Sequence, residues 1–77
     1  TEIRIELATW GAGTSRADVT SRLQGMVRDN ALQFRVTNDA LGGDPAQGHH
    51  KQLIVTYSYR GQRRQAVANE GDYLRIP

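Results

Sequence analysis

The feature that most constrains the fold is a period of two in side-chain polarity, which recurs in short segments along the chain. Successive side chains of a β-strand point to opposite faces, so this period predicts strands with one buried face. Residues 51–59 give the strongest prediction, because they are rich in β-branched and aromatic residues. Both faces carry large side chains: Leu53, Val55, Tyr57 and Tyr59 on one, and Ile54 and Thr56 on the other. We therefore expect a central strand that is covered in part on both sides.

Two other segments share this alternation, and shorter strands follow near the end of the chain. Residues 2–9 and residues 31–38 each place apolar side chains on one face. The predicted inward-facing side chains are Ile3, Ile5 and Leu7 in the first segment and Leu32, Phe34 and Val36 in the second. The turn residues Arg60-Gly61-Gln62 predict that residues 63–68 pair back as a hairpin. A last short strand is expected over residues 73–77, where a terminal proline suits a sheet edge.

One segment follows the helical period instead. Residues 18–28 carry apolar side chains that share one helical face, at Val19, Leu23, Met26 and Val27. We expect a short helix here, with Ser15 or Asp18 available to cap its start. Gly25 weakens this prediction, because glycine lowers helix stability by about 1 kcal/mol relative to alanine.

Turn-forming residues separate these elements and define the architecture. Residues 10–14 contain two glycines and predict a loop, and residues 38–48 form a connection too long for a tight hairpin. The chain has 77 residues and no cysteine, so we expect one domain over residues 1–77. The predicted fold is mainly β: a small antiparallel β-sandwich or sheet of about five strands with one short helix. The alternative is an α+β fold, with the helix packed on one face of an antiparallel sheet.

No constellation in the sequence suits catalysis. The absence of cysteine excludes thiolate nucleophiles and thiolate metal sites. The two histidines, His49 and His50, are adjacent, so on a strand they point to opposite faces and cannot easily share a metal ion. Residues 10–13 resemble a nucleotide-binding loop but lack its full glycine pattern. We expect a non-catalytic domain without a metal or cofactor.

The charged residues give one weak signal. The formal net charge of +2 is too small to predict a nucleic-acid partner, and no apolar run is long enough to span a membrane. Arg60, Arg63 and Arg64 cluster at the predicted hairpin, with Lys51 expected near them, and such a cluster suits phosphate groups. A solvated strand edge that resists aggregation explains the same charges.

The spacing of several motifs resembles a known family. The pattern comprises Asp18-Val19-Thr20, Gly43-Asp44-Pro45, Lys51, Leu53, Val55, Tyr57 and the ending Leu74-Arg75-Ile76-Pro77. It resembles the C-terminal domain of the mitochondrial DnaJ-like membrane-organising proteins, a domain of unknown function. Similar modules are appended to bacterial extracellular proteins, including glucan-degrading enzymes. The resemblance implies a non-catalytic binding role, and Trp10 stands where tyrosine is expected in the family.

The leading functional hypothesis is a carbohydrate-binding, lectin-like module for glucan-type polysaccharides or oligosaccharides. Such modules need an exposed aromatic ring that stacks on a sugar, flanked by planar polar side chains. Trp10 is the best stacking candidate, because we expect it in a glycine-rich loop; a lid over the core is the structural alternative. The candidate ligand-binding residues are Trp10, Asp44, Gln47, His49, Tyr59, Arg60, Gln62 and Tyr73.

Two alternatives remain beside the sugar hypothesis. The chain can be a protein-interaction or scaffolding domain, including one that self-associates as a homo-oligomer. It can also bind anions through the arginine hairpin. An appended module is expected to be secreted, and a stand-alone protein is expected in the cytoplasm. The exposure of Trp10 discriminates: an exposed ring in a polar groove favours sugar, and a buried ring beside an exposed apolar strand face favours a protein partner.

Overall fold

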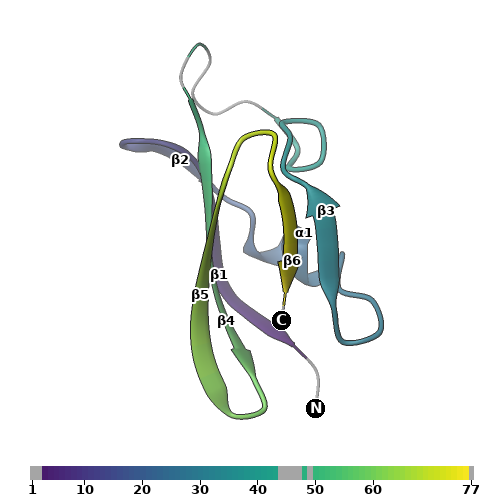
Figure 1. The fold of residues 1–77 in the computed structure, drawn as a ribbon. Coiled ribbons are helices and arrows are strands. Elements are labelled where there is room, and N and C mark those ends of the chain that lie inside the picture. The colour runs from purple at the N-terminus through teal and green to yellow at the C-terminus, as the bar shows by residue number, and fades with distance from the viewer. Residues whose placement is uncertain (1–2, 44–47, 49, 77) are drawn as a thin grey trace.

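The computed structural model describes residues 3–43, 48 and 50–76 of the chain (Figure 1). Strands account for most of the described chain. The elements are β1 (Arg4–Ala12), β2 (Ser15–Asp18), α1 (Thr20–Gln24), β3 (Leu32–Arg35), β4 (Gln52–Tyr59), β5 (Gln62–Asn69) and β6 (Tyr73–Ile76). The mainly β prediction with one short helix is confirmed.

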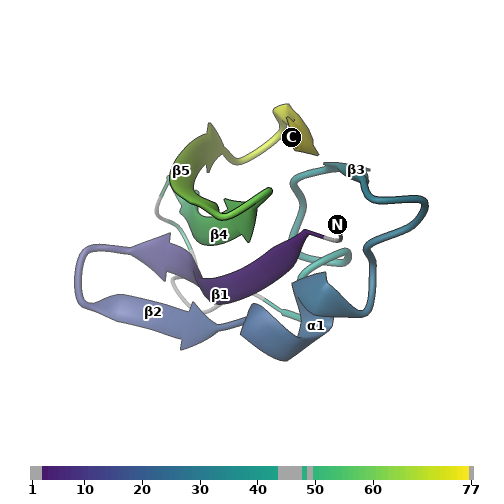
Figure 2. The ribbon, with the colours of Figure 1, turned by 90° about the horizontal axis from the view of Figure 1, so that it is seen from below.

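The strands form two antiparallel sheets that share one core. The larger sheet has the order β2-β1-β4-β5, and the smaller one pairs β3 with β6. Figure 2 shows β3, β6 and α1 on one side of the four-stranded sheet and no helix or strand on its other side. As predicted, β4 is a central strand, and β5 returns along it as a hairpin.

The strand β2 was not predicted, and it brings the number of strands to six. Residues 10–14 were expected to form a loop, but β1 continues through Ala12 and turns back at Gly13, where φ is 55°. Gly11 stays in the strand, opposite Arg16 of β2. Glycine therefore serves here for a close approach of two backbones rather than for a loop.

A β-bulge changes the direction of the side chains along β1. Ile5 lies opposite Tyr57, but Leu7 lies opposite Thr56, so Glu6 is an extra residue in the ladder. An inserted residue reverses the faces of all residues beyond it. Leu7 was predicted to face inward with Ile5, and this was wrong: Leu7 is 51% exposed.

The helix α1 is shorter than residues 18–28, the predicted range. Leu23 is its buried residue, and Gly25 ends it. Val19 holds the cap position without a side-chain bond, while the Asp18 carboxylate accepts hydrogen bonds from the backbone N–H and hydroxyl of Thr20. Met26 and Val27 still pack on the core as partly buried residues beyond the helix. The hydrophobic pattern thus located the contacts correctly but overestimated the helical length.

The same helix covers part of the edge of β1 that β2 leaves free. Gln24 Oε1 accepts the N–H of Ile5 at 2.8 Å, and Thr20 Oγ1 accepts the N–H of Ala8 at 2.9 Å. Side chains of α1 therefore take the place of a neighbouring strand along the first half of β1. This contact protects one edge of the sheet. The strand β5 forms the edge on the other side.

Candidate functional site

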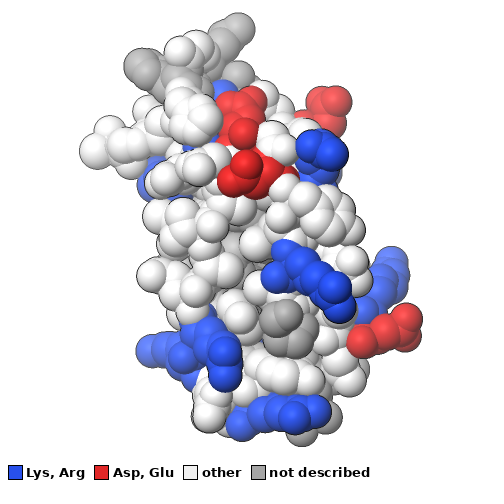
Figure 3. Space-filling view, in the orientation of Figure 1, with Lys and Arg blue, Asp and Glu red and all other residues white. Residues whose placement is uncertain are grey.

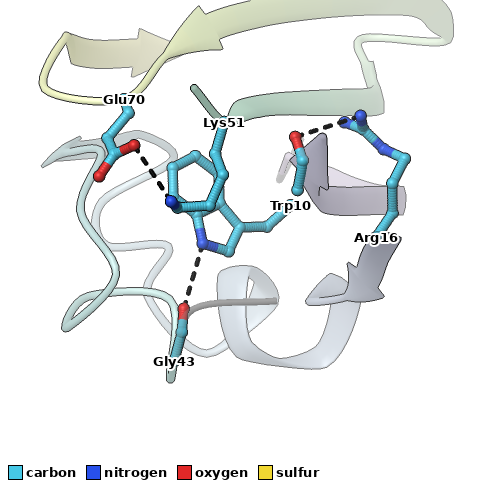
Figure 4. A network of polar contacts seen from close by, with 6 residues as sticks. Trp10, Arg16, Gly43, Lys51 and Glu70 are labelled. Atoms are coloured by element: carbon cyan, nitrogen blue, oxygen red, sulfur yellow. Dashed lines mark hydrogen bonds and ion pairs between the residues drawn. The ribbon is translucent and has the colours of Figure 1, made fainter. Parts of the chain in front are cut away.

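Trp10 lies in the core and not on a loop. Its side chain is fully buried, in β1 between Ala17 of β2 and Leu53 of β4. The indole N–H donates to the carbonyl oxygen of Gly43 at 3.2 Å (Figure 4). The expectation of an exposed stacking ring was therefore wrong. The physical reason is the bulge at Glu6, which turns Trp10 inward, where its indole N–H meets the Gly43 carbonyl.

Lys51 lies in the same buried region. It is 3% exposed, and its ammonium group contacts Glu70 Oε1 at 3.4 Å beside the Trp10 ring (Figure 4). Lys51 was expected near the arginines of the β4–β5 hairpin, and this was wrong. It precedes β4, whereas Arg60 follows the other end of that strand. Its alkyl chain contributes to the core while Glu70 compensates its charge.

The remaining sugar-site candidates do not converge on one groove. Tyr59 is half-buried at the hairpin end of β4, with the Arg60 guanidinium 5.2 Å from its ring centroid. Gln62 begins β5 and accepts a hydrogen bond from Arg64. Tyr73 lies on the other sheet and is 61% exposed. The other three candidates, Asp44, Gln47 and His49, lie outside the described residues.

The outer face of the four-stranded sheet carries two of the large hydrophobic side chains that are exposed among the described residues, Leu7 and Val67. Val67 of β5 lies opposite Ile54 of β4, and Ile54 lies opposite Thr9 of β1. In the next row, Leu7 lies opposite Thr56. Leu7 is 51% and Val67 55% exposed, and Ile54 is half-buried between them. We call Leu7, Ile54 and Val67, with Thr9 and Thr56, the open face.

Polar groups border the open face at the hairpin end. The Arg63 guanidinium contacts Glu6 Oε1 at 2.6 Å through Nη2 and at 3.1 Å through Nε. The hydrogen bond from Arg63 holds the pKa of the Glu6 carboxyl below its ordinary value. Beside this pair, Arg4, Ile5, Glu6 and Ser58 line an open hollow of about 440 Å³. The rim thus combines the Arg63–Glu6 ion pair with the Ser58 hydroxyl and the Arg4 cation, which also favour the ionised Glu6 carboxyl, and such groups suit polar contacts around an apolar centre.

Arg16 fixes the opposite end of the open face. Its guanidinium donates to the carbonyl oxygens of Gly11 and Gln52, and to the hydroxyl of Thr9. The side chain therefore crosses three strands, β2, β1 and β4, on their outer side. The bonds to backbone atoms hold this end of the sheet in one register, so the open face is presented on a rigid support.

The described residues offer little for other kinds of site. They contain no cluster of three or more metal-ligating side chains. No helix in the described ranges combines the length and apolar character needed to cross a bilayer. Sequence reasoning missed the open face, because a regular strand places Leu7 in the core. The available signal was Ile54, an apolar side chain on the second face of the best-predicted strand.

The comparisons with known proteins identify the family. The family model described as DnaJ-like protein C11, C-terminal, matches residues 7–77. The DnaJ homolog subfamily C member 11 of Bos taurus is 41% identical over 63 residues, which cover 78% of this chain and 11% of that protein. The chain thus corresponds to a small part of this much longer relative. No solved structure matches the chain. The domain belongs to the DnaJ-like protein C11 C-terminal family.

Proposed function

We propose that this domain is a non-catalytic protein-interaction module, which binds a protein partner on the open face of its four-stranded sheet. The observation that carries the proposal is the exposure of Leu7 and Val67, both more than half accessible on a strand face that no other described element covers. Contiguous exposed apolar side chains with a polar rim are typical of protein-binding surfaces.

The conformation of β1 supports this choice of surface. The bulge at Glu6 exposes a leucine in the middle of the longest strand while Ala8 and Trp10 fill the core. Bulges that redirect a side chain are common next to functional sites. About half of Leu7 stays exposed and gains nothing from folding, so a partner that covers it supplies a physical reason for its presence. The Arg63–Glu6 pair at the rim then orients the partner.

The size relationship to the relative agrees with a binding role. The matched segment is 11% of the DnaJ homolog subfamily C member 11, so in that protein the domain is one small part of a long chain. A module of this size has limited stability to sustain a strained active site but can present a rigid surface. Binding rather than catalysis is therefore the role that we propose.

Site-specific photo-crosslinking tests the proposal. A photoreactive amino acid replaces Leu7 or Val67, one at a time, in the full-length protein that carries this domain, and crosslinked proteins are identified after irradiation in cells. The matched control position is Tyr73, which is slightly more exposed than Leu7 and Val67 but lies on the smaller sheet. The proposal predicts one protein enriched at both open-face positions and absent at Tyr73, whose purified form binds the domain directly.

The result that contradicts the proposal is equally specific. If the same crosslinks form at Tyr73 as at Leu7, the open face is not a selective surface. If a purified partner binds the Leu7→Lys variant with the same affinity as the wild-type domain, the partner uses another surface. The Leu7→Lys variant keeps the fold, because an exposed strand position tolerates substitution within about 0.5 kcal/mol.

A second candidate function is carbohydrate binding, and one observation favours it. Tyr73 projects from β6 with its hydroxyl 3.3 Å from Gln33 Oε1, between Arg35, which pairs with it, and Arg75 on the same face. An exposed ring flanked by planar polar side chains meets the requirement for stacking on a sugar. Retention on insoluble β-glucan, lost in Tyr73→Ala and kept in Leu7→Lys, supports this function; no retention removes it.

A further inference from the structure

The outer edge of β5 has backbone groups without a described partner. In the order β2-β1-β4-β5, β5 is the last strand of the larger sheet. The two-residue turn Arg60-Gly61, with φ values of 53° and 76°, joins Tyr59 to Gln62. A turn of this kind makes Tyr59 and Gln62 a hydrogen-bonded pair, and such pairs then alternate along the ladder. The backbone groups of Arg63, Gln65 and Val67 therefore point away from β4.

The upper end of this edge is closed by the chain itself. The N–H of Asn69 donates to the Asp72 carboxylate at 3.0 Å, and its carbonyl accepts the N–H of Asp72 at 3.0 Å. Within the described part of the chain, no comparable bond reaches the outward groups of Arg63, Gln65 or Val67. The edge is therefore open over five residues, a length that a short extended peptide can pair with.

The charge along the open edge is positive. Arg63 is highly exposed and its one carboxylate contact is Glu6. Arg64 binds the neutral side chain of Gln62, and Arg60 lies over Tyr59, so neither has an ion pair with a described carboxylate. Figure 3 shows basic atoms over the lower part of β5 and the β4–β5 hairpin, with acidic atoms near the other end of the same strand. An incoming strand thus meets arginines at one end and Val67 at the other.

We propose that β5 accepts an acidic, extended segment of a partner protein as a fifth strand of the larger sheet. This inference rests on the proposed function and adds the chemistry of the partner. Backbone bonds to Arg63, Gln65 and Val67 hold the segment, and antiparallel pairing is the more stable arrangement. Carboxylates beside Arg63 and Arg64 and a β-branched residue beside Val67 fix its register.

A second copy of this chain is the other candidate for the added strand. Two antiparallel β5 strands that pair over residues 63–67 place Arg63 of each copy opposite Val67 of the other. Among the described residues, the carboxylate that contacts these arginines is Glu6, and Arg63 already holds it. In that register no carboxylate lies directly across from Arg63 or Arg64, whereas an acidic segment places one opposite each. Cross-strand charge pairing therefore favours an acidic partner over a second copy.

The test uses a synthetic peptide, Ac-Thr-Val-Ile-Thr-Glu-Glu-Ser-amide, titrated into the 15N-labelled domain. We expect saturable shifts centred on the amides of Arg63, Gln65 and Val67, which weaken as salt is added. Replacing both glutamates by lysine should weaken binding about tenfold, because two favourable cross-strand contacts become repulsive. Equal binding of the two peptides overturns the charge-based choice of partner.

Backbone methylation of the peptide separates strand addition from side-chain docking. Methyl groups on the alternate nitrogens that face β5 remove donors and block approach, and they should abolish binding. Methyl groups on the other set of nitrogens leave the ladder intact, and they should leave the affinity within about threefold. If both methylated peptides bind equally, the segment does not add as a strand and the inference fails.

A protein variant provides the matching control. Gln65→Pro removes one outward N–H of β5 and is compatible with an edge strand, so the domain should fold and lose the peptide. Gln65→Thr keeps that N–H and should bind like the wild type. If Gln65→Pro disturbs the fold, the two methylated peptides still decide the question with the wild-type domain. Undiminished binding to a folded Gln65→Pro variant contradicts the inference.

Failure of strand addition at β5 can be distinguished from failure of the proposed function. Leu7 lies on β1, which β4 separates from β5, so Leu7→Lys should leave the acidic peptide bound. One outcome is that Leu7→Lys loses the crosslinked partner while the wild-type domain does not bind the peptide. That outcome supports the open face and refutes strand addition. A salt-insensitive dimer that Gln65→Pro abolishes identifies a second copy as the occupant of the edge, which also refutes the acidic segment.

Discussion

The indole N–H of Trp10 donates to the carbonyl oxygen of Gly43, and this bond joins residue 43 to the centre of the larger sheet. Trp10 is fully buried, with Leu53 beside it in β4. The residue that sequence reasoning placed on the surface is therefore a central element of the core. This changes the functional argument, because the binding surface has to be sought on the outer side of the sheet.

Replacement of Trp10 should test its structural role. Trp10→Ala should destabilise the domain by about 3–5 kcal/mol, because it creates a large cavity, and a domain of this size has little more stability than that. Trp10→Phe keeps much of the apolar contact and should cost less. Urea denaturation followed by circular dichroism measures both. A loss below about 1 kcal/mol for Trp10→Ala contradicts the buried position of the ring.

Gly11 and Gly13 should differ sharply in their tolerance of a side chain. A Cβ on Gly11 would clash with the carbonyl oxygen of Ser15 and lie 2.7 Å from the Cα of Arg16, whereas one on Gly13 meets no atom within 4 Å. Gly11→Ala should therefore separate β1 from β2. Gly13→Asn should be tolerated, because asparagine adopts a left-handed conformation more readily than most residues. Thermal unfolding of the two variants compares them, and equal melting temperatures would argue against the paired hairpin.

The buried ion pair predicts an asymmetry between its two members. Lys51→Met removes the charge and retains the alkyl chain, so the loss of stability should be small. Glu70→Ala leaves the Lys51 ammonium buried without this carboxylate, and we expect a loss of about 1–3 kcal/mol. Chemical denaturation of both variants checks the order. A larger loss in Lys51→Met than in Glu70→Ala contradicts it.

The Arg63–Glu6 contact predicts a pH dependence. The hydrogen bond from Arg63 lowers the pKa of Glu6 from its ordinary value of 4.5, since it favours the ionised form in the folded state. The contribution of the pair to stability is therefore fully present above that ordinary value and is lost as the pH falls through the lowered, folded-state pKa. A carbon-detected NMR titration of the Glu6 carboxyl should show its midpoint rising in Arg63→Gln. An unchanged midpoint means that the pair does not form in solution.

Much of the fold could be predicted from residue patterns because burial imposes a strict period. The alternation of Leu53, Val55 and Tyr57 identified β4, and the Arg60-Gly61 turn identified its hairpin with β5. The strand β2 escaped prediction because its four residues show no alternation of burial. The helix was overestimated because it ends at Gly25, and Met26 and Val27 contact the core from irregular backbone that leads to a separate turn at Asp29 and Asn30, where φ is positive.

The site was harder to predict than the fold, and β1 shows the reason. One extra residue, Glu6, exchanges the faces of every side chain beyond it. A pattern alone cannot reveal the bulge, because Leu7 continues the alternation of Ile3 and Ile5. The consequence is a double error: Leu7 was placed inside, the leading functional hypothesis placed Trp10 on the surface, and the structure shows the reverse for both.

The most direct test of the central claim uses the partner that crosslinking identifies. Its affinity, in purified form, is measured for the wild-type domain and for the variants. Isothermal titration should show that Leu7→Lys and Val67→Lys, both folded, weaken binding at least about tenfold, since each places a charge in the apolar centre of the interface. Tyr73→Ala, on the other sheet, should bind like the wild type. Full affinity in both lysine variants would contradict the account and direct attention to the smaller sheet.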